Sequence, residues 1–124
     1  MVVLIDDEED FLLSLSKRLN LNGYQTSTYV DSQRAIEEIP RIFQNAKAIL
    51  IDFSMDTSNE DGKVWEKFVE VKSKESIDTP LFIMTGYDEH HSILEKAKIN
   101  EIQSIFHKPH FFDDLLESLK NLPN

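Results

Sequence analysis

The chain has 124 residues, of which 40% are hydrophobic and 29% are charged; this composition indicates one soluble globular domain, residues 1–124, and excludes a disordered chain. The 23 acidic and 13 basic side chains give a net charge of −10, and cysteine is absent, which disfavours direct binding to nucleic acid or anionic lipid and excludes disulfides and thiolate metal sites. The sequence has neither a run of about 18 apolar residues nor a signal peptide, so we expect no membrane insertion and a cytoplasmic location.

The N-terminal part of the sequence predicts a strand followed by a helix. Val2–Ile5 is a continuous apolar run, which is typical of a strand buried on both faces. From Glu9 to Leu21, apolar residues recur at nearly helical spacing. Asn22-Gly23 supplies residues that tolerate the left-handed conformation at a helix end.

A second strand and helix follow. Tyr24–Tyr29 is rich in Thr and Tyr and alternates in character, which indicates a more exposed strand. Asp31 or Ser32 can cap the next helix. We expect Pro40 to end or kink that helix.

The rest of the sequence repeats this alternation. Three further apolar runs predict strands at Ala48–Ile51, Leu81–Met84 and Ser104–His107. Helices are predicted over residues 64–71, from about residue 89 to 98, and over Phe111–Leu122 with a cap near Asp113. Strands that alternate with helices pair in parallel through right-handed crossovers, so we expect an α/β fold.

Polar residues stand at the carboxyl ends of four predicted strands: Asp6 with Asp7, then Asp52, Thr85 and Lys108. In a parallel sheet these ends lie along one edge, where open α/β sheets bind ligands. Gathered carboxylates raise each other's pKa and suit a hard divalent cation such as Mg²⁺. An alternative is that the aspartates only cap the first and third helices.

The same residues suit phosphoryl transfer. A carboxylate can attack phosphorus to form an acyl phosphate, and the charge on the transferred group must be neutralised. Lys108 can supply a cation and Thr85 a hydroxyl, while the backbone amide of Gly86 can approach closely because glycine has no side chain. The bond before Pro109 tolerates cis geometry, which could aim the lysine inward.

The ordered set Asp6-Asp7, Asp52 with Met55, Thr85-Gly86 and Lys108-Pro109 resembles the receiver domains of two-component response regulators, the CheY-like domains, over essentially the whole chain. The resemblance implies a (βα)5 doubly wound three-layer sandwich of the flavodoxin-like kind. Its five-stranded parallel sheet would have the order 2-1-3-4-5.

The resemblance also implies the function. Asp52 would accept a phosphoryl group from a histidine kinase or phosphotransfer protein in a Mg²⁺-dependent reaction. Asp7, Asp52 and the backbone carbonyl of Ser54 would hold the metal, with Asp6 acting through water. Thr85, Gly86 and Lys108 would bind the phosphoryl group. Such a domain is no conventional metabolic enzyme, although it catalyses its own phosphorylation and dephosphorylation.

Output would pass to a downstream effector protein through the face formed by the helix near residues 89–98, the strand Ser104–His107 and the last helix. Two departures from the family bear on this. The acidic loop of residues 56–62 is longer than usual, and Ile105 stands where the family commonly has Tyr or Phe. Phe106 faces the opposite side of the strand and cannot replace that ring. Dimerisation on phosphorylation stays open.

Two other functions remain as alternatives. A receiver-like module could act through protein contacts without phosphorylation, and the missing aromatic at Ile105 favours this reading mildly. A phosphatase of the dehalogenase type also uses a strand-end aspartate. That chemistry needs an acid two residues after the nucleophile, and Ser54 occupies this position.

Overall fold

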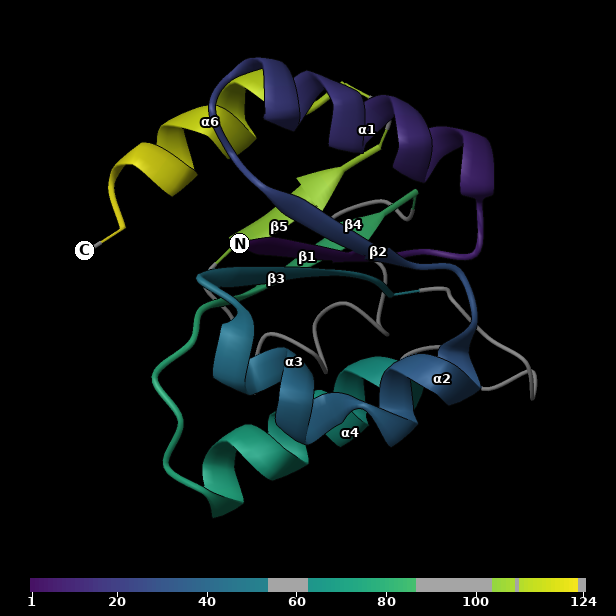
Figure 1. The fold of residues 1–124 in the computed structure, drawn as a ribbon, viewed down its shortest axis with the longest axis vertical. Helices are drawn as coiled ribbons and strands as arrows, with labels where there is room; N and C mark the ends of the chain where they lie inside the picture. The colour runs from purple at the N-terminus through teal and green to yellow at the C-terminus, as the bar shows by residue number, and fades with distance from the viewer. Residues whose placement is uncertain (54–62, 87–103, 109, 123–124) are drawn as a thin grey trace.

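A single parallel sheet forms the centre of the structure, a computed structural model that describes residues 1–53, 63–86, 104–108 and 110–122. Its strand order is β2-β1-β3-β4-β5 (Figure 1). The strands are β1 (Val2–Ile5), β2 (Thr26–Tyr29), β3 (Ala48–Asp52), β4 (Leu81–Thr85) and β5 (Ser104–His107). The expected parallel α/β sheet and its strand order are therefore confirmed.

Helices cover both faces of the sheet and give the fold three layers (Figure 1). One face carries α1 (Glu9–Leu21) and α6 (Phe112–Lys120). The other face carries α2 (Ser32–Glu37), α3 (Ile39–Asn45) and α4 (Lys63–Lys74). The helix expected from about residue 89 to 98 lies outside the described residues. None of the helices in the described ranges is both long enough and apolar enough to cross a membrane.

The central strands are apolar throughout because each of their faces packs against helices. Val3 and Ile5 of β1 point into the core that α4 covers, whereas Val2 and Leu4 point toward α1 and α6. All residues of β1, β3 and β4 are buried. Burial of each large apolar side chain contributes roughly 1.5–3 kcal/mol, so the continuous apolar runs fix the strands in the middle of the molecule.

Two predicted helix ends are confirmed. Gly23 follows α1 with a φ of 90°, a conformation that glycine adopts without steric cost. Asp31 precedes α2, and its carboxylate accepts a hydrogen bond from the amide of Gln33 at 2.9 Å. This side chain satisfies a backbone N–H that the helix itself leaves unpaired.

The break expected near Pro40 is confirmed, because α2 ends at Glu37 and a separate helix, α3, starts at Ile39. Pro40 lies in the first turn of α3, where a missing N–H costs nothing. Other predicted boundaries differ from the structure. Asp113 is not a cap. Phe111 holds that position without a side-chain hydrogen bond, and Asp113 instead places its charge in the first turn of α6. The second strand begins at Thr26 rather than Tyr24.

Candidate functional site

The carboxyl ends of four strands meet at one edge of the sheet. Asp52 and Thr85 are the last residues of β3 and β4, and Asp6 and Lys108 directly follow β1 and β5. The backbone N–H of Lys108 donates to the carbonyl of Thr85 at 2.8 Å, which continues the pairing of β4 with β5. The parallel topology thus brings these residues together, as the sequence predicts.

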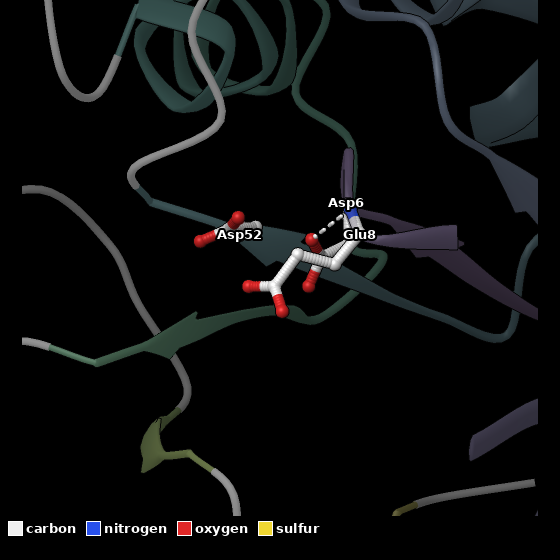
Figure 2. Close-up of side chains that lie close together, drawn as sticks. All are labelled: Asp6, Glu8 and Asp52. Atoms are coloured by element: carbon white, nitrogen blue, oxygen red, sulfur yellow. Dashed lines mark hydrogen bonds between the residues drawn. The ribbon is translucent and has the colours of Figure 1, made fainter. Parts of the chain in front are cut away.

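Three carboxylates form a compact group at this edge. Oxygen atoms of Asp6, Glu8 and Asp52 all lie within 4.8 Å of one another. Figure 2 shows the Glu8 side chain extending over Asp6 on the side that faces Asp52. The amide of Glu8 donates to Asp6 Oδ1 at 2.9 Å, which fixes the turn between β1 and α1. Asp6 and Asp52 are buried, whereas Glu8 is exposed.

The ammonium of Lys108 lies among these carboxylates. Its Nζ is 2.6 Å from Asp6 Oδ2, 3.1 Å from Glu8 Oε1 and 3.5 Å from Asp52 Oδ2. The Phe11 ring lies on another side, with its centroid 4.7 Å from Nζ, a distance at which a ring attracts a cation. These contacts hold the lysine, whose side chain is only 11% exposed, against the end of the sheet.

Burial shifts the ionisation of the group. It raises the pKa of Asp6 to about 6; the hydrogen bond from Lys108 lowers that pKa, and the charge of Asp52 raises it further. Desolvation acts to lower the pKa of Lys108, but the hydrogen bond to Asp6 and the charge of Asp52 outweigh it and raise that pKa. One ammonium against three carboxylates leaves an excess of negative charge.

This excess and the type of donor suit a hard divalent cation. Mg²⁺ prefers oxygen ligands, retains several waters and is commonly held by one or two carboxylates. The oxygens of Asp6, Asp52 and Glu8 are close enough to surround one ion together with water. The donor set therefore fits the Mg²⁺ that the sequence predicts.

Comparisons with known proteins bear on the fold. No protein-family model matches the sequence, and no curated protein matches it significantly. A response regulator receiver domain from Clostridium thermocellum superposes with a TM-score of 0.77 at 18% identity, covering 98% of this chain and 91% of that chain. Chemotaxis protein CheY4 of Vibrio cholerae gives 0.77 at 20% identity, with 98% and 97% covered. The chain has the fold of a response regulator receiver domain.

A third structure with the receiver fold was solved with ligands. The response regulator TrrA of Thermotoga maritima, in complex with Mg²⁺ and BeF, has a TM-score of 0.75 at 23% identity. The match covers 98% of this chain and 97% of TrrA. This match, like the other two, shows that the chains share a fold.

The remaining predicted site residues divide into two groups. Asp7 and Gly86 are described, and both are exposed beside the site. Burial and the neighbouring Asp6 raise the pKa of the Asp7 carboxyl, and a Cβ added at Gly86 would meet no atom within 4 Å. Ser54 and Pro109 lie outside the described residues, so their predicted roles stay predictions.

The side chains of β5, the strand that precedes Lys108, alternate between the two faces of the sheet as predicted. Ile105 packs on the core that includes Ile83, whereas Phe106 is buried on the opposite face. The Phe106 ring stacks between Phe82 and Phe111, with centroid distances of 5.5 and 5.4 Å. Phe106 is therefore a core residue and does not take the place of an aromatic at Ile105.

Glu8 is the one member of the carboxylate group that the sequence reasoning missed. It lies in an uninterrupted acidic run from Asp6 to Asp10. Which acid turns toward Asp52 depends on where the strand ends and the helix starts. Because Glu8 immediately precedes α1, it remains in the turn, whereas Glu9 and Asp10 belong to the helix.

Proposed function

We propose that this chain acts as a phosphorylation-controlled receiver domain, with Asp52 as the acceptor. A histidine kinase or phosphotransfer protein would supply the phosphoryl group. The observation that carries the proposal is the position of the Asp52 carboxylate, buried at the end of β3 and 3.5 Å from the Lys108 ammonium. The grouping of Asp52 with Asp6 and Glu8 adds the carboxylates that a divalent cation needs.

The chemistry is a displacement at phosphorus. A carboxylate oxygen of Asp52 attacks the phosphorus of a phosphohistidine, and an O–P bond forms as the P–N bond breaks. The electron pair of that bond stays on the imidazole nitrogen, which takes up a proton from solvent. Hydrolysis later reverses the modification when water attacks phosphorus, and Asp52 leaves as a carboxylate.

The protein's own groups would stabilise the transferred phosphoryl group by charge and hydrogen bonds. Lys108 Nζ is within salt-bridge distance of Asp52 and can form an ion pair with an oxygen of the new phosphate. Thr85, at the end of the neighbouring strand, can donate its hydroxyl. Gly86 comes next in the sequence, and its backbone amide can donate a further hydrogen bond to the phosphoryl group.

Asp6, Asp52 and Glu8, whose oxygens lie together, would hold Mg²⁺, and the family resemblance adds Asp7 and the Ser54 carbonyl as ligands. When bound, the ion neutralises negative charge on the phosphoryl oxygens. Asp6 and Glu8 also position Lys108, since both accept its ion pairs.

The output would be a change in protein contacts. The added charge at Asp52 favours one of two conformations, and a partner that binds that conformation reads the signal. The face proposed for the effector consists of the segment near residues 89–98, β5 and α6. Sedimentation of the phosphorylated protein would detect a dimer that forms on phosphorylation.

Acetyl phosphate offers a direct test, because it supplies a phosphoryl group without a kinase. We expect intact-mass measurement to show one added phosphoryl group with Mg²⁺ and none with EDTA. Asp52→Asn should gain nothing, whereas Asp10→Asn, a change at an exposed carboxylate in α1, should behave as the wild type. A folded wild-type protein that gains no phosphoryl group would contradict the proposal and favour a phosphorylation-independent binding module.

A further inference from the structure

The sheet has an open edge at β2. This strand pairs with β1 in the described part of the chain and forms the end of the strand order (Figure 1). Val2 N–H donates to the carbonyl of Gln25, and Asp6 N–H to that of Tyr29. Backbone groups alternate in direction along a strand, so those of Thr26 and Thr28 face away from β1. No strand in the described ranges pairs with these outward groups, so the edge can offer its donors and acceptors to a further strand.

β2 lacks the lysine, proline and charged residues that commonly protect an edge strand, although it is short. Its sequence is Thr-Ser-Thr-Tyr. Edge strands without such residues readily pair with another extended chain. The edge is thus chemically suited to accept one.

A basic pocket of about 250 Å³ lies beside this edge on the side of α2 and α3. Ser27 and Tyr29 contribute to its lining, together with Arg34 and Arg41. Both arginine side chains are more than two-thirds exposed, at 71% and 76%. The protein as a whole has a net charge of −10, so two exposed guanidiniums on one pocket give this part of the surface a charge of the opposite sign.

In the described part of the chain, Glu38 is the one carboxylate within ion-pair distance of these two arginines, and Asp31 adds a weaker electrostatic interaction with Arg34. Glu38 lies 3.0 Å from Arg34 Nε and 3.7 Å from Arg41 Nη1, and it accepts a hydrogen bond from the Tyr29 hydroxyl at 3.1 Å. Glu38 is the one acid among the described residues that line this pocket beside the two arginines, so the lining itself keeps an excess of positive charge. An incoming carboxylate would pair with the loosely held Arg41.

A second pocket, of about 310 Å³, lies along the same strand on the side of α1. Leu12, Leu13 and Val30 line it, and Leu13 and Val30 are exposed large hydrophobic residues at 56% and 44%. Glu9, Asp31 and Arg34 also line this pocket. Two carboxylates beside one guanidinium leave an excess of negative charge, which disfavours an acidic ligand there. Apolar side chains therefore suit this side.

We propose that the β2 edge binds an extended segment of a partner protein in which acidic and apolar residues alternate. Side chains of a strand point alternately to the two faces of a sheet. A strand added to β2 would place its acids toward Arg34 and Arg41 and its apolar residues toward Leu13 and Val30. Backbone hydrogen bonds give such strand addition its affinity, and the flanking pockets give it specificity.

A second copy of this chain suits the edge less well than a partner protein does. Pairing of two β2 strands would place Thr, Ser and Tyr opposite the arginines, with no acid among them. A segment with alternating acids supplies the charge that the basic pocket lacks. The proposal does not depend on phosphorylation of Asp52, since none of its residues belongs to the carboxylate group.

A synthetic peptide with the repeat Glu-Val tests the proposal on the whole, unphosphorylated protein. Calorimetry gives the affinity, and amide NMR locates the contact. We expect binding with chemical-shift changes at Thr26 and Thr28, and no binding of the matched Lys-Val peptide. The double variant Arg34→Glu/Arg41→Glu should weaken binding by at least about tenfold, whereas Lys17→Glu/Lys67→Glu, the same charge change at exposed positions, should have a far smaller effect.

The variant Thr28→Pro tests the backbone contribution separately. Because the Thr28 N–H faces the open side, proline removes it without breaking the pairing with β1. Circular dichroism confirms folding, and loss of peptide binding supports the proposal. Absence of binding to the wild type, or unchanged binding in both the arginine and proline variants, would overturn it. An edge-to-edge dimer in sedimentation, without peptide binding, would overturn it in favour of a second copy as occupant.

Discussion

The ammonium of Lys108 lies 2.6 Å from the carboxylate of Asp6, which joins the end of β5 to the end of β1 across the edge of the sheet. The same ammonium is 3.5 Å from Asp52. One lysine thus links three strands at the proposed phosphorylation site, and the properties of the site depend on that link.

Removal of this cation should destabilise the protein. Lys108→Met leaves Asp6 and Asp52 buried without their ammonium, and loss of one partner from a buried ion pair costs roughly 3 kcal/mol. Urea unfolding without divalent cations should show this loss. We expect MgCl₂ to restore part of it, because a cation that binds only the folded state stabilises that state. Lys17→Met, at an exposed position in α1, is the control, and equal losses in the two variants would argue against the pairing.

Asp6 should make stability depend on pH in a defined direction. Its pKa is raised from 3.8 to about 6 in the folded protein, so its contribution to stability is complete below about pH 4 and is lost as the pH rises through 6. Asp6→Asn stays neutral and should be more stable than the wild type at pH 7 by up to about 3 kcal/mol. The comparison is made by urea unfolding without divalent cations at pH 4 and 7. If the difference between variant and wild type does not grow with pH, the raised pKa is wrong.

Glu8 should contribute to cation binding although it is exposed. Its carboxylate belongs to the group formed with Asp6 and Asp52, so Glu8→Gln removes one donor from that group. We expect Mg²⁺ affinity, measured by calorimetry, to fall roughly tenfold. Glu9→Gln changes the adjacent acid in the first turn of α1 and should leave the affinity nearly unchanged. Equal effects of the two changes would indicate general charge attraction instead of a ligand at Glu8.

Phe106 should matter for stability. The side chain is 5% exposed and stacks against Phe82 and Phe111. Phe106→Ala should therefore lower the free energy of unfolding by about 3–5 kcal/mol. Leu13→Ala, at a side chain 56% exposed, should lower it by less than about 1 kcal/mol. A small effect at Phe106 would place it outside the core.

Much of the fold could be predicted from the sequence because its strongest signals are local. The continuous apolar runs of β1 and β3 reflect strands buried on both faces. Gly23 and Asp31 mark helix ends through their own backbone and side-chain chemistry. Parallel topology then places Asp6, Asp52, Thr85 and Lys108 at one edge.

The sequence was insufficient where packing in three dimensions decides the structure. Pro40 predicts the break after α2 but not the new helix that follows it, which the packing of Ile39, Ile42 and Phe43 in the core favours. Glu8 could not be singled out from the neighbouring acids. Its place near Asp52 depends on a turn in which the Glu8 amide donates a hydrogen bond to the Asp6 carboxylate.

The most direct measurement is the chemical location of the phosphoryl group. After reaction with acetyl phosphate and Mg²⁺, borohydride reduces an aspartyl phosphate to homoserine, and peptide mass spectrometry then identifies the reduced residue. We predict homoserine at position 52 alone. Homoserine at another aspartate, or at no position in the folded protein, would contradict the assignment of Asp52 as the phosphoacceptor.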